Sequence, residues 1–266
     1  MIAIQLNGGL GNQLFQYATA RAHALKQNEL PYLDLSLLKE QNAANKFHLD
    51  SFKIKADYNL SYWQRWWFHN VTKKKLNRFT EESYKENLIP RENVYLKGYW
   101  QNRSYFHDIR EKLIAEIRPV SEFSSSILSR IKKTESVAVH IRRGDYTGND
   151  LHEVCTPLYF MNAMNFIRSQ IPAPLFFIFS DDIGYCKEQI KNSDDIIFVE
   201  EKDIIASFWL MKNCRHFVLS NSSYSWWAQY LSREQNIITA PPHWFNDSRI
   251  NTRGIYFSHW KIIETV

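Results

Sequence analysis

Two adjacent arginines, Arg142 and Arg143, follow a short apolar run, residues 136–139, that is typical of a buried strand. Arginine binds phosphate well, because its planar fork donates parallel hydrogen bonds and keeps its charge. The segment 140–145 therefore predicts an anion-binding site at the end of a strand. The alternative, which this segment alone leaves open, is that one arginine is a surface residue and the other pairs with Asp145.

Two further polar clusters follow apolar runs later in the chain. Asp181 and Asp182 come directly after one run, and a serine-rich segment, residues 220–225, follows another. From residue 136 to residue 239 such runs alternate with helical periodicity, which predicts an α/β unit with a parallel sheet and helices on both faces. Ligands bind beyond the carboxyl ends of such strands, so we expect the three clusters to form one site.

Each cluster suits one part of a nucleotide. The arginines can neutralise a diphosphate, and a carboxylate of Asp181 or Asp182 can accept the paired hydrogen bonds of a guanine. Hydroxyls and free backbone N–H groups at the start of a helix hold phosphate, and Ser222, Ser223 and Ser225 fit that role. Helix capping would explain the serines and Asp181 individually, but it does not explain the paired arginines.

The N-terminal end carries a glycine-rich turn between an expected strand, residues 2–6, and an expected helix, residues 13–28. Such a turn lets backbone approach a ligand beside a helix N-terminus. A dinucleotide fingerprint with Asp34 as the ribose partner is one interpretation. Leu14 replaces its third glycine, so a nicotinamide oxidoreductase is a weaker alternative.

A proline followed by a serine cluster, residues 119–126, indicates a domain boundary, and we place the division between residues 128 and 129. In the first half, segment 99–102 joins two aromatic side chains to two amides, a combination that suits either a sugar or an ordinary turn. Further elements of this half are expected at residues 32–35, 94–96 and 104–117.

The charge of the chain, +5, is concentrated between residues 53 and 78, which hold seven basic residues and one acid. This uneven placement argues against a general nucleic-acid binder. Within it, segment 62–75 combines aromatic and basic residues. Contact with the inner face of a membrane is one hypothesis; a core helix followed by a solvated charge run is the one that we favour.

Three cysteines with wide spacing suggest reduced thiols, and neither a signal peptide nor an apolar run of about 20 residues is recognisable. We therefore expect a cytoplasmic protein. The chain has no Asp-x-Asp and no HExxH motif, so no metal ion and no cofactor are expected.

Three blocks, residues 8–18, 140–146 and 221–231, resemble the signature blocks of bacterial α-1,2-fucosyltransferases of glycosyltransferase family 11. The resemblance implies a GT-B-like fold with two Rossmann-like domains facing a cleft. The acceptor-side domain would span residues 1–128. The GDP-fucose-binding domain, a doubly wound parallel sheet, would span residues 129–266, with a last helix or tail that could return to the first domain.

The resemblance also implies the reaction: L-fucose moves from GDP-β-L-fucose to the 2-OH of a terminal galactose, with inversion and without metal. In the family pattern Arg142 holds the β-phosphate, His140 and Asp181 lie near guanine, and Asn12 faces the fucose or the diphosphate. Further substrate contacts are expected from Gly11, Gln13, Trp100, Arg143, Asn221, Ser222, Ser223, Ser225 and Trp226.

An inverting transfer needs a group that takes the acceptor proton, unless the departing phosphate does so. In the α-1,6 relatives an acid lies shortly after the arginine pair, and Asp150 has that spacing here. We rank Asp150 first, Asp145 second and Glu153 third. Arg142 would stabilise the departing diphosphate.

The expected partners are GDP-fucose and a galactose-terminated or lipid-linked glycan of a surface polysaccharide, with no nucleic acid. Two alternatives stay open beside the oxidoreductase. One is another GDP-sugar fucosyltransferase, for example with α-1,6 specificity. The other is a non-catalytic protein that binds a GDP-sugar or a glycan.

Overall fold

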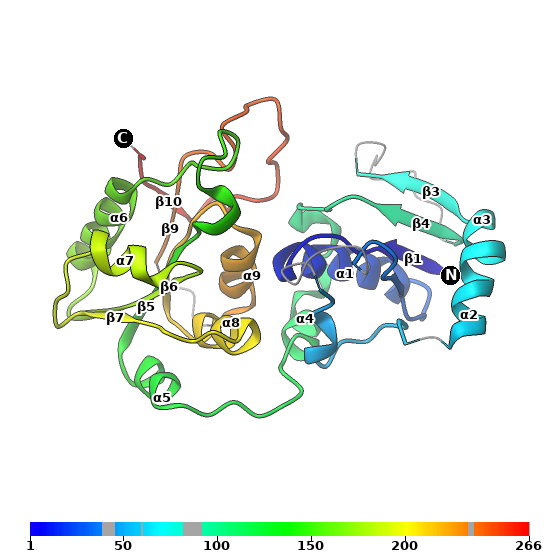
Figure 1. Cartoon of the computed structure of the whole chain (residues 1–266), viewed down its shortest axis with the longest axis horizontal. Coiled ribbons are helices and arrows are strands. Elements are labelled where there is room, and N and C mark those ends of the chain that lie inside the picture. The colour runs from blue at the N-terminus through cyan, green and yellow to red at the C-terminus, as the bar shows by residue number, and fades with distance from the viewer. Residues whose placement is uncertain (39–45, 60, 82–91, 234–236, 266) are drawn as a thin grey trace. The chain divides into compact units, whose positions relative to one another are not determined.

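The computed structural model describes residues 1–38, 46–59, 61–81, 92–233 and 237–265. The chain divides into two compact units, Met1–Val120 and Ser121–Val266. The division falls inside the boundary segment 119–126, ahead of the position between residues 128 and 129 that the sequence suggested. Each unit contains its own parallel sheet (Figure 1), which agrees with the α/β class expected from the sequence.

The first unit has four parallel strands in the order β2-β1-β4-β3. Helix α1 (Leu10–Leu25) follows the first strand and is buried along most of its length. Three of the strands were expected, and β3 was not, because its sequence is mostly polar. The strands are β1 (Ile2–Gln5), β2 (Tyr32–Asp34), β3 (Asn77–Thr80) and β4 (Val94–Lys97).

Helix α1 begins at Leu10, earlier than the expected start at residue 13. The glycine turn before it explains the difference. Gly8 has a positive φ of 79°, and a Cβ atom there would lie 2.6 Å from Asn12 Nδ2. The backbone N–H of Gln13 donates to the carbonyl of Gly9 (3.0 Å), which completes the first helical turn.

The helix expected over residues 104–117 is broken in the structure. It consists of two short 3-10 turns, Arg103–Tyr105 and His107–Ile109, followed by α4 (Arg110–Glu116). Phe106, between the turns, has non-helical backbone angles and is fully buried, with its ring 5.8 Å from that of Phe15. Packing of this one aromatic side chain overrides the helical periodicity.

Segment 62–75 is helical but is not a core helix, so the hypothesis that we favoured from the sequence is wrong. It comprises α2 (Tyr62–Trp67), a π-helical turn (Phe68–Thr72) and α3 (Lys73–Lys75). No residue of α2 is buried. Only Phe68 and, just beyond the segment, Leu76 enter a small apolar core with Tyr32 and Tyr95.

The second unit has six parallel strands in the order β10-β9-β8-β5-β6-β7. Helices α6 and α7 cover one face of this sheet, and α8 and α9 lie on the other (Figure 1). This doubly wound arrangement confirms the expected architecture. The strands are β5 (Glu135–Ile141), β6 (Pro174–Ser180), β7 (Ile196–Phe198), β8 (His216–Val218), β9 (Ile238–Ala240) and β10 (Lys261–Ile262).

Alternation along the central strands distributes side chains between the two faces. Val137 and Val139 of β5 join the apolar core beneath α6 and α7, whereas His140 faces Tyr224 of α9. Two elements, α5 and β10, were not expected from the sequence. The helices are α5 (Ser126–Lys133), α6 (Pro157–Gln170), α7 (Ile183–Gln189), α8 (Ile204–Lys212) and α9 (Ser223–Leu231). Within the described ranges, none of the helices has the length and apolar character needed to cross a bilayer.

Candidate active site

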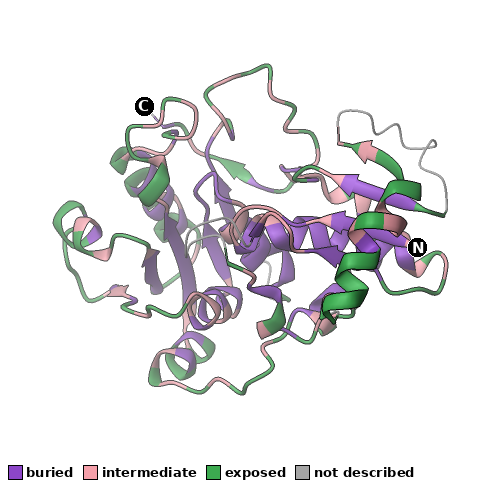
Figure 2. Ribbon diagram, turned by 45° about the vertical axis from the view of Figure 1, so that its right-hand side comes forward, coloured by how far each residue is buried: buried purple, intermediate pink, exposed green. Residues whose placement is uncertain are grey.

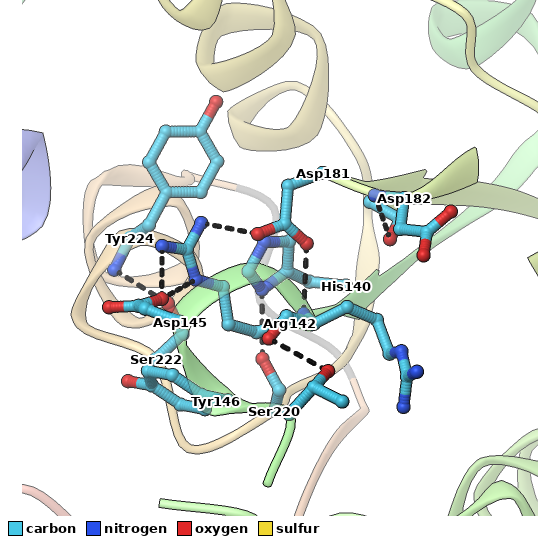
Figure 3. Close-up of polar contacts among 12 residues, drawn as sticks. His140, Arg142, Asp145, Tyr146, Asp181, Asp182, Ser220, Ser222 and Tyr224 are labelled. Carbon is cyan, nitrogen blue, oxygen red and sulfur yellow. Dashed lines mark hydrogen bonds and ion pairs between the residues drawn. The ribbon is translucent and has the colours of Figure 1, made fainter. Parts of the chain in front are cut away.

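The three polar clusters meet at the carboxyl edge of the second sheet, as the sequence predicted. Strand β5 lies between β6 and β8, so their ends are neighbours. Arg142 Nη1 lies 2.8 Å from Asp181 Oδ2, and His140 Nδ1 lies 2.8 Å from Ser220 Oγ. The hydroxyl of Tyr146 donates to the carbonyl of Asn221 (3.2 Å). Figure 3 shows the contacts of Arg142 with Asp181 and of His140 with Ser220.

Arg142 lies between two carboxylates. Its Nε and Nη2 donate to Asp145 Oδ1 (3.1 and 2.6 Å), and its Nη1 pairs with Asp181. A guanidinium has five N–H donors; these contacts use three, so two remain for a ligand. Burial alone would lower the pKa of Arg142, but Asp181 and Asp145 raise it above its ordinary value, so the side chain stays charged.

Both carboxylate oxygens of Asp181 have a partner within the protein. Oδ1 accepts from the backbone N–H of Arg143 (2.8 Å), and Oδ2 pairs with Arg142. A Cβ atom at Gly144 would lie 2.5 Å from Oδ2, so glycine is needed there for close approach. The helix cap is Asp182, which accepts from the backbone N–H of Tyr185. Asp181 thus fixes Arg142 and the turn after β5.

Arg143 points elsewhere than Arg142. Its guanidinium carbon lies 3.7 Å from the centre of the Tyr185 ring, and its Nη1 lies 4.0 Å from Glu153 Oε1. Its Nε is buried and has no hydrogen-bond partner among the described residues. A cavity opens beside both arginines. The cavity is lined in part by Tyr146, His152, Glu153, Tyr185 and Asn221.

His140 is buried and uncharged. Burial, and then the nearby charge of Arg142, lower the pKa of His140 to about 3. Its imidazole contacts the hydroxyl of Ser220 and faces the ring of Tyr224, at 5.4 Å between ring centres. A neutral imidazole can both donate and accept a hydrogen bond, which suits recognition of a polar base edge.

The start of α9 uses its serines in capping. The hydroxyl of Ser222 accepts from the backbone N–H of Tyr224 (3.3 Å), and Ser225 Oγ donates to the carbonyl of Ser222 (3.2 Å). Ser223 is the first helical residue. Asn221 is buried, and its amide donates to the carbonyls of His152 (2.9 Å) and Trp244 (3.0 Å). These contacts position the start of α9.

The three candidate bases differ in how far their carboxylates are occupied. Asp145 binds Arg142, and Glu153 Oε2 accepts from the backbone N–H of Gly148 (3.1 Å). The exposed Asp150 carboxylate has no hydrogen bond or ion pair within the described part of the chain, whereas its backbone carbonyl accepts from Asn246 Nδ2 (2.8 Å). Asp150 therefore has a fixed backbone and an unoccupied side chain.

Among the candidates in the first unit, Gln13 is structural. Its buried amide donates to the carbonyls of Gly8 (2.8 Å) and Lys46 (2.9 Å) and accepts from the backbone N–H of His48. Gly11 is buried within α1. Asn12 is partly exposed, and its Oδ1 accepts from Gln101 Nε2 (2.9 Å). Of these residues, Asn12 is the one with a partly exposed side chain.

Two tryptophans expected to contact substrate lie in the core instead. Trp100 is fully buried against Tyr105, and the exposed aromatic residue of its segment is Tyr99. Trp226 is fully buried, stacks on Tyr230 and donates from its indole N–H to the carbonyl of Ile255 (2.8 Å). Large aromatic side chains suit sugars and cores equally, so residue type alone could not decide between the two.

Asp34, the ribose partner of the oxidoreductase alternative, is buried. Its Oδ2 accepts from Lys73 Nζ (2.8 Å) and from the hydroxyl of Tyr95 (2.6 Å). A carboxylate enclosed in this way is not available to a nucleotide. In the parts of the chain that the structure describes, no three His, Cys, Asp or Glu side chains form a metal-binding group.

Sequence reasoning missed Tyr185 as part of this site and gave Tyr146 and Ser220 no role in it. Ser220 was inside a quoted cluster but had no assigned role, and its contact with His140 follows from the pairing of β5 with β8. Tyr185 lies in the first turn of α7, and the fold brings its ring to Arg143. Tyr146 ends the signature block 140–146, whereas no sequence pattern marks Tyr185.

Solved fucosyltransferase structures share this fold. The fucosyltransferase NodZ from Bradyrhizobium matches with a TM-score of 0.52 and 14% identity, over 89% of this chain and 94% of that one. A structure of POFUT1 in complex with GDP matches with a TM-score of 0.55 and 12% identity, over 90% and 97%. The protein therefore has the GT-B-like α/β fold of fucosyltransferases.

Residues 1–264 match the model of glycosyl transferase family 11, and the chain belongs to that family. An Escherichia coli α-1,2-colitosyltransferase is 33% identical, over 99% of both chains. The galactoside 2-α-L-fucosyltransferase SEC1 of Bos taurus is 26% identical, over 90% of this chain and 67% of that one. The protein is thus a glycosyltransferase related to fucosyl- and colitosyltransferases.

Proposed function

We propose that this glycosyltransferase moves L-fucose from GDP-β-L-fucose to the 2-OH of a terminal galactose. The product is an α-1,2 linkage in a surface polysaccharide or oligosaccharide. The observation that carries the proposal is the state of Arg142. It is held by two carboxylates at a strand end, and two of its N–H donors stay available to a ligand.

In this mechanism the bond between the anomeric carbon and the β-phosphate oxygen breaks, and its electron pair leaves with GDP. Arg142 and the backbone N–H groups at the start of α9 stabilise the charge that develops on the diphosphate. Asp181 keeps Arg142 in place. The acceptor oxygen attacks the opposite face of the sugar, and its proton passes to Asp150. No metal ion takes part in this scheme.

Asp150 is our proposed base because its carboxylate is exposed and unoccupied. Asp150→Asn should lower kcat about 100-fold or more, since general base catalysis contributes at that level. The Kd for GDP should stay unchanged. Asp194→Asn, a change at another exposed acid of the same unit, is the matched control. Near-normal kcat in Asp150→Asn would exclude this base and turn attention to Asp145.

The decisive experiment incubates the protein with GDP-fucose and with lactose, N-acetyllactosamine or a Galβ1,3-linked acceptor, with and without EDTA. We expect a trisaccharide whose NMR spectrum shows an α-1,2 linkage to galactose, formed equally well in EDTA. An α-1,6 product would support another fucosyltransferase specificity. GDP binding without any turnover, across the acceptors, would support a non-catalytic binding protein.

A second donor needs consideration because an α-1,2-colitosyltransferase is 33% identical over almost the whole chain. Colitose is L-fucose without its 3-hydroxyl. A site that hydrogen-bonds this hydroxyl rejects the deoxy sugar strongly, whereas an apolar site tolerates both. The ratio of kcat/KM for GDP-fucose to that for GDP-colitose decides between the donors, and a ratio well above one supports fucose.

We also propose that the second unit binds the donor and that the first unit serves the acceptor. We further propose that the enzyme works in the cytoplasm. The cysteines Cys155, Cys186 and Cys214 form no disulfide, which suits a reducing compartment. Fractionation of cells that express the protein tests the location. Recovery outside the cytoplasmic and membrane fractions would contradict it.

A further inference from the structure

One helix of the first unit leaves its aromatic residues in water. Tyr62, Trp63, Trp66 and Trp67 of α2 are 69%, 74%, 47% and 58% exposed. Their spacing brings them to one side of the helix. Figure 2 shows α2 as an exposed helix. Large aromatic side chains are normally among the most buried, so a contiguous exposed group marks an interaction surface.

The orientation of this surface is fixed from the inner side. Phe68 is buried, with its ring 4.1 Å from that of Tyr32, and Leu76 is buried as well. Lys73 turns inward and pairs with the buried carboxylate of Asp34 (2.8 Å). Rotation of the helix would bury the tryptophans only by pulling these residues out. The outward position of the aromatic residues is therefore a stable feature.

Basic residues surround the aromatic group. Arg65, Lys74, Lys75 and Arg78 are exposed and have no ion pair within the described ranges. Residues 58–78 contain no acidic residue at all. An open apolar hollow lined by Met1, Trp63, Trp67 and Phe68, among others, lies on the same segment. The surface is thus complementary to a partner that is apolar and negatively charged.

We propose that this surface docks on a bilayer that contains anionic lipid. We call it the α2 surface: Tyr62, Trp63, Trp66 and Trp67 with Arg65, Lys74 and Lys75. Tyrosine and tryptophan rings favour the depth of lipid head groups, and lysine and arginine attract anionic phosphates. A second copy of the chain fits less well, because a symmetric contact would bring the same basic residues together.

Docking of this kind is peripheral, since α2 lies on the bilayer and does not enter it deeply. It does not depend on the sugar chemistry. If the acceptor is lipid-linked, the α2 surface would hold the enzyme at the plane where that acceptor lies. Binding is therefore measured without donor or acceptor, so that its failure leaves the proposed function intact.

The test is flotation of the full chain with vesicles of phosphatidylcholine, with and without phosphatidylglycerol. The wild-type protein should float with the anionic vesicles and stay behind with the neutral ones. Lys74→Gln/Lys75→Gln should lower the partition coefficient roughly 25-fold, since each basic residue near an anionic surface contributes about fivefold. Trp63→Ala/Trp67→Ala should abolish flotation.

Matched controls lie in the second unit. Lys132→Gln/Lys133→Gln changes two exposed lysines of α5, and Leu158→Ala changes an exposed apolar residue of α6. Both should float like the wild type. All four variants should bind GDP and turn over a soluble acceptor normally, which shows that they are folded.

Three results would overturn the proposal. The wild-type protein could fail to float with anionic vesicles, or both α2 variants could float as it does. In the third, sedimentation would show a wild-type dimer that Trp63→Ala/Trp67→Ala converts to monomers, with no vesicle binding. That result would assign the α2 surface to a second copy of the chain.

Discussion

Two clusters of charge, one in each unit, show how similar residues serve different purposes. The closed cluster is Asp34, Lys73 and Tyr95; the open cluster is Arg142, Asp145 and Asp181. In the closed cluster the side chains of Asp34 and Lys73 are 1% and 17% exposed. In the open cluster Arg142 is 34% exposed and Asp145 is 70% exposed. Both clusters carry a carboxylate at the end of a strand, so this position alone does not distinguish the closed cluster from the open one.

The difference lies in how completely their polar atoms are used. Asp34 accepts from Lys73, from Tyr95 and from the backbone N–H of Ser36 (3.0 Å). Burial alone would raise the pKa of Asp34, but these hydrogen bonds lower it below its ordinary value. The open cluster keeps two N–H donors of Arg142 unused. We infer that a satisfied, enclosed cluster supports the fold and that an exposed one with unused donors binds a ligand.

The largest expected effect tests the open cluster. Arg142→Ala should lower kcat/KM about 1,000-fold, because it removes the charge that faces the departing diphosphate. The Kd for GDP should rise about 100-fold, which isothermal titration calorimetry measures. The free energy of unfolding should change little by comparison, since the arginine is partly exposed and its removal leaves two carboxylates that water can reach.

Arg168→Ala is the control for this variant. Arg168 is 35% exposed and pairs with Asp195 (2.8 Å), so it has the burial and ion pairing of Arg142 without its position. It should leave GDP binding and turnover at wild-type levels. Equal losses in both variants would mean that the effect of Arg142→Ala comes from stability and not from the site.

A substitution in the closed cluster should lower stability and leave GDP binding unchanged. Lys73→Met leaves the buried carboxylate of Asp34 without its cation, and it should lower the free energy of unfolding by about 3 kcal/mol. The Kd for GDP should not change. Urea denaturation measures the free energy of unfolding, and calorimetry measures the Kd for GDP.

A double-mutant cycle with Asp34→Asn measures the interaction energy between Lys73 and Asp34 apart from the effect of each single substitution. The double variant should be more stable than Lys73→Met alone, because neither charge is then left unpaired. Loss of GDP binding in Lys73→Met, with the fold intact, would erase the distinction between the two clusters.

The sequence predicted the second unit better than the first, for identifiable reasons. Helix α6 begins where its sequence favours a helix start, because Thr156 caps it and Pro157 stands at its first position. In the first unit Phe106 interrupts a periodic segment through its packing on Phe15. The outward face of α2 could not be predicted, since only the structure shows that Lys73 is drawn inward to Asp34.

The sequence predicted where the site lies, but it did not predict which side chains contact one another there. Alternating strands and helices located the clusters at one sheet edge, and the pairing of β5 with β6 and β8 brought them together. The sequence could not show that Asp181 would bind Arg142. It also could not show that Trp100 and Trp226 are core residues, because burial depends on neighbours distant in sequence.

A smaller effect should follow from crowding the open cluster without changing any charge. In Gly144→Ala the new methyl group would meet Asp181 Oδ2 at 2.5 Å and displace it from Arg142. We expect GDP to bind about tenfold more weakly, as measured by calorimetry. Gly184→Ala is the control, because its methyl group meets Asp182 at 3.7 Å, an ordinary contact. Wild-type affinity in Gly144→Ala would show that Asp181 does not position Arg142.

The last effect is a dependence of stability on pH that arises beside the open cluster. In the folded protein the pKa of His140 is about 3, because the ring is buried and lies near Arg142; the ordinary value is 6.5. Between these values the unfolded chain binds a proton that the folded chain does not. The free energy of unfolding is therefore not reduced by His140 above pH 6.5, and it falls as the pH is lowered from 6.5 toward 3.

Urea denaturation from pH 6.5 downward measures this dependence. The free energy of unfolding should fall by up to about 1.4 kcal/mol per pH unit more in the wild type than in His140→Gln, which has no such group. His243→Gln, a change at an exposed histidine, should keep the wild-type slope. If His140→Gln keeps that slope as well, His140 is not the residue that resists protonation. The assignment of a neutral imidazole to His140, beside the open cluster, would then be wrong.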